Sequence, residues 1–330
     1  MADPARRRAP LLWQLLRPGT AILILLQALL CHLLLGLPAP HPVAALGGVL
    51  LIAFWYAHAV AINDLSDVAA DAINLAGAGD RPLINKSAST RTVWVAAWIL
   101  SGAVIVLGLV LSPWLALAGL IMVLLNLAYS LPPVRLSGRG VASQLLLPIG
   151  YVIFPAVVVW GIAGQSAVSW RGVLGVAGLY LLLVGRLFLK DIRDVEGDRR
   201  TGKRTFLVRH GLRITLVAAA VALTAGVLIM LLAIVPPLRW ALIAAAVITI
   251  VAEPLLLITV YAEPELDRQL LLVGLVGRVA SLWTFCCTIA LAVTQWGSVP
   301  WWQQELVTAL GVIMFGASAY PFAEELRRAR

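Results

Sequence analysis

Long apolar segments follow one another along almost the whole chain, and short polar connections separate them. A helix needs about 20 apolar residues to cross the hydrocarbon core of a bilayer. By this criterion the pattern predicts nine membrane-spanning helices and a tenth near the carboxyl terminus. The expected spans are approximately 20–37, 43–62, 93–111, 114–131, 144–163, 172–190, 213–235, 239–261, 270–294 and 304–321. The expected fold class is therefore all-α, a polytopic membrane helix bundle of nine or ten helices.

Composition supports this interpretation. Hydrophobic residues make up 61% of the chain and charged residues only 12%, which is typical of a membrane protein. The net charge of +9 would suggest nucleic-acid binding in a soluble protein, but basic cytoplasmic loops explain it here. Cys31, Cys286 and Cys287 lie in apolar segments without the spacing of a metal site. We therefore expect the lipid bilayer as a partner, and no nucleic acid.

The distribution of basic residues predicts the orientation. If the amino terminus is cytoplasmic, most of the 25 lysine and arginine residues fall on the cytoplasmic side of the predicted spans. The basic carboxyl-terminal tail, residues 326–330, then favours an even number of spans and hence ten. We expect a multi-pass protein of the cell membrane, with its amino terminus and its two longest polar loops in the cytoplasm.

Two polar segments carry aspartates with the same internal spacing. They are Asp64, Asp67 and Asp71 in the first segment and Asp191, Asp194 and Asp198 in the second. Helical positions i, i+3 and i+7 share a face, so each trio forms an acidic stripe if its helix continues past the membrane edge. Asn63 joins the first stripe. We call these sets the first and second aspartate stripes.

Each stripe follows the second span of a four-span half. This position predicts a single domain, 1–330, with two repeated halves at about 20–131 and 144–261, followed by carboxyl-terminal helices within 270–321. Because the repeat axis would run along the membrane normal, the two stripes are expected to face each other across one cytoplasmic mouth.

Six carboxylates at one mouth repel one another unless cations are present. Mg²⁺ prefers such hard oxygen ligands and commonly shares them with substrate phosphates. Nearby basic residues are suited to hold the remaining phosphate oxygens: Arg81, Arg199, Arg200, Lys203 and Arg204. Cations on both sides of a diphosphate would stabilise it as a leaving group. The alternative is that the aspartates cap helices or pair with basic loop residues.

The motifs Asn63-Asp64-x-x-Asp67-x-x-x-Asp71 and Asp191-x-x-Asp194-x-x-x-Asp198 resemble the two signature motifs of the UbiA superfamily of intramembrane prenyltransferases. The strings "DRPL" (80–83), "YSLPPVRL" (129–136) and "KDIRDVEGD" (190–198) also resemble family segments in the same order. The resemblance implies a bundle around a central cavity, in which both motifs hold Mg²⁺ and a prenyl diphosphate. Ionisation then yields an allylic cation that a lipophilic acceptor captures.

Three features depart from the family pattern: the segment "AINLAGAGD" (72–80), Ser137 and Gly138 in place of a lysine, and the tenth helix. The residues expected to contact the substrate diphosphate are Asn63, Arg81, Tyr129, Arg135, Lys190 and Lys203.

Several of these residues have a structural alternative. Tyr129 could instead be an interfacial tyrosine, and Arg135 could anchor to lipid headgroups. Arg186 either contacts the diphosphate or neutralises a neighbouring charge. Trp55, Tyr56 and His58, just before the first stripe, either line a tunnel for the prenyl chain or pack in the core.

Two charged residues lie deep within predicted spans. Intramembrane charges are costly and usually pair, so Glu253 and Arg278 are expected to form a structural ion pair. The alternative is that Glu253 accepts a proton or orients the acceptor. Gly274 and Gly277, beside Arg278, are expected to permit close helix packing.

The sequence therefore predicts a Mg²⁺-dependent membrane prenyltransferase. One alternative is a terpene cyclase of the same superfamily, in which the chain's own double bonds trap the cation. Another is a transporter or lipid carrier, which the predicted internal repeat would also suit. A transporter would place its ion ligands near the middle of the membrane, whereas the aspartates lie at one mouth.

Overall fold

The computed structural model describes residues 10–74, 81–234 and 239–295. Within these residues, nine helices are long and apolar enough to cross a membrane. The predicted tenth helix, 304–321, lies outside the described residues, as does most of the glycine-rich segment that follows the first stripe. The expectation of an all-α membrane bundle is confirmed.

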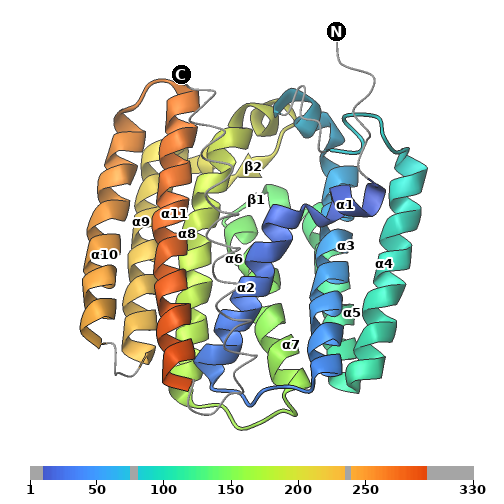
Figure 1. Ribbon diagram of the computed structural model, residues 1–330. Helices are drawn as coiled ribbons and strands as arrows, with labels where there is room; N and C mark the ends of the chain where they lie inside the picture. Colours follow the sequence, from blue (N-terminus) through green and yellow to red (C-terminus); the bar gives the residue numbers. More distant parts are fainter. Residues whose placement is uncertain (1–9, 75–80, 235–238, 296–330) are drawn as a thin grey trace.

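The helices follow one another with short connections (Figure 1). The first five are α1 (Leu11–Leu16), α2 (Pro18–Leu35), α3 (Pro42–Asn74), α4 (Thr90–Leu111) and α5 (Pro113–Ser130). A 3-10 turn, η1 (Leu136–Gly138), precedes a sixth span made of α6 (Ala142–Pro148), the π-helical turn η2 (Ile149–Ile153) and α7 (Phe154–Ile162). The remaining helices are α8 (Trp170–Arg200), α9 (Phe206–Ala233), α10 (Arg239–Ala262) and α11 (Leu266–Gln295).

Local sequence explains several helix boundaries. The Ser89 side chain accepts a hydrogen bond from the Thr92 amide and caps α4. Pro18 and Pro113 occupy the first turns of α2 and α5, where a missing N–H has no cost. The expected spans agree with the observed helices to within a few residues, except at the two ends that carry the aspartates and at the start of α9, which lies seven residues before the predicted 213.

The helices α3 and α8 are much longer than the predicted spans. They contain 33 and 31 residues, or about 50 and 46 Å at a rise of about 1.5 Å per residue, whereas the hydrocarbon core is about 30 Å thick. The predicted ends at 62 and 190 were therefore wrong, because hydropathy marks where a helix leaves the lipid and not where it stops. The aspartates lie on helix ends and not in loops.

Glycines bring α8 and α9 into close contact along their length. A Cβ added at Gly226 of α9 would lie 2.6 Å from the backbone nitrogen of Leu182 in α8. A Cβ at Gly178 or Gly185 of α8 would similarly meet the backbone of α9. Small residues at a helix interface allow this approach. The contact holds α8, the helix of the second stripe, against the α9–α11 group that Figure 1 shows on one side of the bundle.

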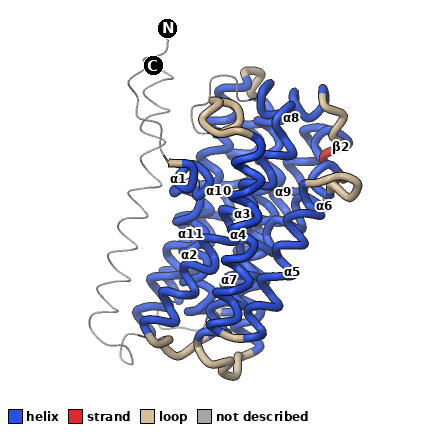
Figure 2. The backbone as a smooth tube through the Cα atoms, turned by 90° about the vertical axis from the view of Figure 1, so that its right-hand side faces the viewer, coloured by secondary structure: helices blue, strands red, loops and turns tan. Residues whose placement is uncertain are grey.

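Two very short strands form the only sheet in the described residues. Strand β1 (Arg139–Gly140) pairs in parallel with β2 (Arg204–Thr205). The pattern of apolar residues did not predict them, because each has two residues. They join the segment after α5 to the segment after α8, at the end of the bundle where α3 and α8 also finish (Figures 1 and 2). The division of the chain into two repeated halves stays a prediction.

Candidate active site

A cavity of about 1060 Å³ lies between the helices and collects most of the predicted site residues. Its polar lining includes Asp67, Asp71, Asp191, Asp194 and Asp198 together with several basic side chains. Its apolar lining comes from α2, α3, α5 and the α6–α7 span, and includes Ile22, Trp55, Met122, Leu147 and Tyr151. Trp55 precedes Asp67 by 12 residues on α3, about 18 Å along the helix axis. The cavity thus combines an acidic mouth with an apolar interior.

The first aspartate stripe is held by arginines from two other segments. Asp64 is buried, and its Oδ1 accepts short hydrogen bonds from both Arg17 and Arg81. Arg81 also lies 3.4 Å from an oxygen of Asp71. Asn63 donates to Asp67 at 2.9 Å, as expected for neighbours one helical turn apart. Among the described residues, Asp64 is the aspartate of this stripe that stands outside the cavity lining.

The second stripe has different partners. Asp191 is buried and accepts a hydrogen bond of 2.8 Å from the side-chain amide of Gln144 in α6. Asp194 pairs with Arg193 at 2.8 and 3.2 Å. Lys190 is exposed on one side, lines the cavity on the other and attracts Asp191 and Asp194 electrostatically. An amide and two cations therefore accompany Asp191 and Asp194.

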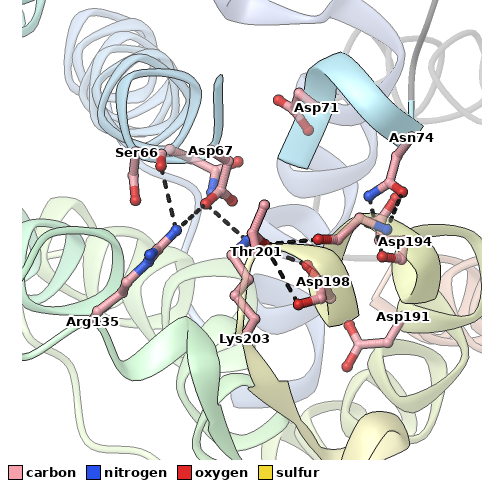
Figure 3. A network of polar contacts seen from close by, with 12 residues as sticks. Ser66, Asp67, Asp71, Asn74, Arg135, Asp191, Asp194, Asp198, Thr201 and Lys203 are labelled. Carbon is pink, nitrogen blue, oxygen red and sulfur yellow. Dashed lines mark hydrogen bonds and ion pairs between the residues drawn. The ribbon is translucent and has the colours of Figure 1, made fainter. Parts of the chain in front are cut away.

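Lys203 joins the two stripes directly (Figure 3). Its Nζ lies 2.8 Å from Asp67 on α3 and 3.5 Å from Asp198 on α8. Arg135 approaches Asp67 from the other side at 3.3 Å. The structure thus brings together two stripes that are far apart in the sequence, with a lysine between them.

Asn74 makes a second connection between α3 and α8. Its amide nitrogen donates to the backbone carbonyl of Asp194 at 3.1 Å, and its oxygen accepts from the amide of Gly197 at 2.7 Å. Gly197 is necessary because a Cβ there would lie 2.4 Å from the Asn74 side chain. The last turn of α3 is therefore fastened to the helix that carries the second stripe.

We next ask whether the aspartate oxygens of the two stripes are suited to bind a divalent cation. In this structure the carboxylates pair with cations, and no three acidic or histidine side chains of the described residues converge in metal-binding geometry. The charges of the six aspartates are balanced by six cations: Arg17, Arg81, Arg135, Lys190, Arg193 and Lys203. A diphosphate would add negative charge that these cations do not balance.

One buried carboxylate oxygen of the first stripe also lacks a hydrogen-bond partner among the described residues. This oxygen is Oδ2 of Asp64. Mg²⁺ usually binds charged oxygen ligands beside a substrate phosphate. It takes only one or two protein carboxylates and completes its coordination shell with phosphate oxygens and water. The residues present therefore fit Mg²⁺ with a diphosphate as co-ligand.

The other residues predicted from the sequence lie partly in the cavity lining and partly outside it. Tyr129 is buried and lines the cavity, as do Trp55 and Tyr56. His58 instead forms a buried hydrogen bond of 3.0 Å to Asn126, so the core-packing alternative describes it. The remaining predicted cations are exposed and lie outside the cavity lining of the described residues: Arg199, Arg200 and Arg204.

Sequence reasoning missed three residues that hold the aspartates: Arg17, Asn74 and Gln144. Arg17 stands just before the first apolar span, where a basic residue is explained by the positive-inside bias alone. Gln144 had a usable signal, because an amide at the start of an apolar span usually has a polar partner. Asn74 lay in what was expected to be a loop.

The predicted ion pair between Glu253 and Arg278 is wrong. Glu253 is completely buried, and its two carboxylate oxygens have no hydrogen-bond partner among the described residues. The cation whose charge attracts it is that of Arg186 on α8. Arg278 instead lines the cavity. The prediction compared only the depth of the two residues along their helices. Depth does not show which face of each helix a side chain occupies.

Comparisons with known proteins agree with this architecture. The model of the UbiA prenyltransferase family matches residues 24–269. A digeranylgeranylglyceryl phosphate synthase of Natronomonas pharaonis is 31% identical over 212 residues, which cover 63% of this chain and 71% of that protein. The corresponding synthase of Pyrococcus horikoshii is 29% identical over 204 residues, covering 60% and 68%.

Solved structures show the same fold. A UbiA homologue from Archaeoglobus fulgidus bound to DMAPP and Mg²⁺ superposes with a TM-score of 0.61 at 18% identity, covering 86% of this chain and 99% of that one. A UbiA homologue from Aeropyrum pernix gives a TM-score of 0.56 at 19% identity, covering 83% and 96%. The family match, the membrane-spanning bundle and the paired aspartate stripes lead to one conclusion: the chain belongs to the UbiA prenyltransferase family and is a Mg²⁺-dependent multi-pass membrane prenyltransferase.

Proposed function

We propose that the acidic mouth binds the diphosphate of a prenyl diphosphate while the apolar lining of the cavity receives its chain. The observation that carries this proposal is the convergence of the two stripes on Lys203, at the mouth of a cavity with apolar walls. A transporter would require its charged ligands near the middle of the membrane. Here the stripes lie on helix ends that extend beyond the length needed to span a bilayer.

The carboxylates that face the cavity are the proposed Mg²⁺ ligands: Asp67, Asp71, Asp191, Asp194 and Asp198. Asp64 joins them through its free Oδ2 once Arg17 and Arg81 turn to the substrate. Bound Mg²⁺ supplies Lewis-acid stabilisation of the leaving diphosphate. Gln144 and Asn74 hold the second stripe in place while its charge environment changes.

The cations now paired with aspartates are the proposed phosphate ligands. Arg17, Arg81, Arg135 and Lys203 each contact a carboxylate of the first stripe. Guanidinium groups bind phosphate oxygens with charge-assisted, often bidentate hydrogen bonds. Exchanging a carboxylate for a phosphate keeps each cation paired while it frees carboxylate oxygens. Lys190 and Asn63, which were expected from the sequence to contact the diphosphate, line the cavity. Arg135 reaches Asp67 from outside the cavity lining of the described residues.

The reaction begins when the bond between C1 of the prenyl group and the diphosphate oxygen breaks. The diphosphate keeps the electron pair, and the prenyl group becomes an allylic cation. Tyr129 is the aromatic side chain of the lining that lies closest to the aspartates in the charge interactions it makes, and an aromatic ring there stabilises the cation. Trp55 and Tyr56 line the cavity further along α3. A nucleophilic atom of the acceptor then forms the new bond to C1, and the proton that it loses passes to the released diphosphate.

Transfer to an acceptor is favoured over cyclisation by the relatives that match this chain. The relatives from Natronomonas pharaonis and Pyrococcus horikoshii are both named as synthases of a glyceryl phosphate product. We infer that this chain also uses a separate lipophilic acceptor. We further infer that the mouth, the amino terminus and the ends of α3 and α8 face the cytoplasm, because most of the basic residues lie at that side of the predicted spans.

The test uses purified full-length protein in nanodiscs with labelled geranylgeranyl diphosphate, Mg²⁺ and a lipid extract as the source of acceptor. Asp67→Asn and Asp191→Asn are expected to lower the rate of diphosphate release by about a hundredfold or more, because each removes a negative ligand from the cation site. Glu196→Gln is the matched control, since Glu196 is exposed on the same helix as Asp191 and pairs with Arg200.

Diphosphate release at the wild-type rate in both aspartate variants would contradict the proposed site. A cyclic hydrocarbon or alcohol formed without the lipid extract would select the cyclase alternative, which uses the same ionisation but no acceptor.

A further inference from the structure

Deeper than the aspartates, the cavity has a polar side and an apolar side. Arg186 of α8 and Arg278 and Ser281 of α11 line the polar side. The expectation of close helix packing is wrong for Gly274 on this side, where an added Cβ would meet no atom of the described residues within 4 Å. The side between α3, α5 and the α6–α7 span is lined mainly by aliphatic and aromatic side chains. A prenyl chain is a hydrocarbon and is therefore expected to follow the apolar side.

On the apolar side, the lining ends at one level on three elements. Counted from the mouth, the deepest lining residues among those described are Trp55 on α3, Met122 on α5, and Gly150 and Tyr151 on η2. These residues meet, because a Cβ added at Gly150 would lie 2.3 Å from the Trp55 indole and 3.4 Å from Cε of Met122. The rings of Trp55 and Tyr151 pack edge to face with their centroids 6.4 Å apart. We call Trp55, Met122 and Gly150 the floor of the cavity.

Trp55 is the largest side chain of this floor. It is buried, and its Nε1 has no hydrogen-bond partner among the described residues. Within the described part of the chain, packing and not hydrogen bonding therefore holds the indole. One neighbour is Gly150, which leaves room for the ring, and another is Phe154, whose ring centroid lies 5.2 Å away. Phe154 is buried four residues beyond Gly150 and outside the cavity lining of the described residues, so it forms the next wall behind Trp55.

The depth of the floor corresponds to a particular chain length. Trp55 precedes Asp67, the lining aspartate nearest to it on α3, by 12 residues, which is about 18 Å along the helix axis. An extended chain advances about 1.2 Å per covalent bond, so this depth accepts about 15 bonds, the length of a C20 prenyl chain. Each further isoprene unit adds roughly four bonds, or about 5 Å. A C25 chain would therefore reach past the floor.

We propose that Trp55, packed on Gly150, sets C20 as the longest prenyl chain that the cavity accepts. This inference rests on the proposed function, because it concerns the chain of the same prenyl diphosphate. A longer chain meets the indole and has to fold back or displace it, and such overpacking is unfavourable. Without the indole the chain can extend to Phe154, and the 5.2 Å between the two ring centroids is about the length of one isoprene unit.

The experiment measures binding to the full-length protein in nanodiscs with Mg²⁺. Tritiated geranylgeranyl diphosphate (C20) is displaced by unlabelled C15, C20, C25 and C30 prenyl diphosphates. Each competitor is supplied at the same mole fraction of the lipid, so that differences in partitioning into the bilayer do not contribute. In the wild-type protein the C25 and C30 compounds are expected to compete about tenfold or more weakly than the C20 compound, because overpacking opposes their binding.

Trp55→Ala removes the indole and should allow the C25 compound to compete within about twofold of the C20 compound. The C30 compound should still compete about tenfold more weakly, because Phe154 then ends the cavity. Trp55→Phe is a smaller change that is less disruptive to folding, and the C25 compound should then compete about threefold more weakly than the C20 compound.

Trp283→Ala is the matched control for the loss of a buried indole. Trp283 on α11 is completely buried, its Nε1 also has no hydrogen-bond partner among the described residues, and it lies outside their cavity lining. This variant loses comparable packing and should keep the wild-type order of chain lengths.

A variant that raises the floor tests the same geometry in the opposite direction. Ala59 lines the cavity one helical turn nearer to the mouth than Trp55 and on the same face of α3. Ala59→Phe should shorten the apolar side by about 6 Å, roughly one isoprene unit. With tritiated C15 diphosphate as the tracer, the C15 compound should then compete about tenfold more strongly than the C20 compound. Ala53→Phe is the control, because Ala53 is partly buried on the same helix but outside the cavity lining of the described residues.

Equal competition by the C20, C25 and C30 compounds in the wild-type protein would overturn the proposal. An unchanged order of chain lengths in both Trp55→Ala and Trp55→Phe would also overturn it. If every chain length binds with Mg²⁺ but no limit is found, the role of Trp55 fails and the proposed function stands. If no prenyl diphosphate binds, the proposed function fails and the inference about Trp55 fails with it.

Discussion

Removing the charge of Lys203 is the most direct test of the way in which the two stripes are held together. The Lys203 ammonium lies 2.8 Å from Asp67 and 3.5 Å from Asp198, and the three side chains are only 8%, 11% and 6% exposed. Lys203→Met keeps the apolar stem and removes the charge. The variant would leave two poorly hydrated carboxylates facing each other across the mouth of the cavity.

The expected loss of stability follows from these contacts. Removing one partner of a buried ion pair costs about 3–5 kcal/mol. The lower value, about 3 kcal/mol, applies here because Arg135 remains 3.3 Å from Asp67. For a chain of this length each kcal/mol corresponds to a change of about 2 °C in Tm, so Tm should fall by about 6 °C in a buffer with EDTA. Mg²⁺ should restore much of this loss, because it binds the carboxylates that Lys203 no longer neutralises.

Tm is measured by tryptophan fluorescence of the protein in one detergent, first with EDTA and then over a series of Mg²⁺ concentrations. Arg200→Met is the matched control, since Arg200 and Glu196 form an ion pair at the end of α8, the helix that carries Asp198, with 64% and 57% exposure. An exposed pair contributes less than about 1 kcal/mol, so the control should lose no more than about 2 °C. If Mg²⁺ raises Tm equally in Lys203→Met and the wild type, the two stripes do not share a cation site.

Three further variants test other parts of the structure. Asn74→Ala removes hydrogen bonds of 3.1 and 2.7 Å between α3 and α8; Tm should fall by about 4 °C, corresponding to about 2 kcal/mol, and an unchanged Tm would show that the helix ends do not depend on this contact. Gly150→Ala places a Cβ 2.3 Å from the Trp55 indole in the cavity wall. The kcat/KM for a C20 donor should therefore fall about tenfold relative to a C10 donor, and an unchanged ratio would exclude this wall from chain selection. Gly226→Val forces α9 away from the Leu182 backbone, only 2.6 Å from the added Cβ, so the variant should aggregate in size-exclusion chromatography, whereas a monodisperse peak would contradict the packing.

The hydropathy pattern predicted most of the fold. It located the nine membrane-spanning helices of the described residues, because a membrane-spanning segment must satisfy its backbone internally and present apolar side chains to lipid, so each span carries its own signal. It failed at the ends of α3 and α8, where the helix continues into water and the apolar signal stops. The acidic spacing of three and four residues recovered what hydropathy missed, because it predicted a helical face at those positions.

The sequence predicted which types of residue form the candidate site, but only some of the contacts between them. Asp67, Asp198 and Lys203 were named from residue type and spacing, and the structure brings them together. Arg199 and Arg200 have the same charge and lie in the same segment, yet they are exposed. Residue type alone cannot separate them from Lys203, because the difference arises at the end of α8. Arg199 and Arg200 are the last two residues of that helix, whereas the chain turns after it and the Lys203 amide donates to the carbonyl of Asp198.

By itself, the sequence determined the membrane spans and the two acidic helix faces, since both follow from local periodicity and spacing, and its motifs resembled those of the family to which the chain belongs. Only the tertiary structure decided which side chains meet, Arg17 with Asp64 and Gln144 with Asp191, and that the charge attracting Glu253 is that of Arg186. The physical reason is that a charge in a sequence shows the need for a partner, whereas the partner's identity depends on which helices pack together and on how each is rotated about its axis.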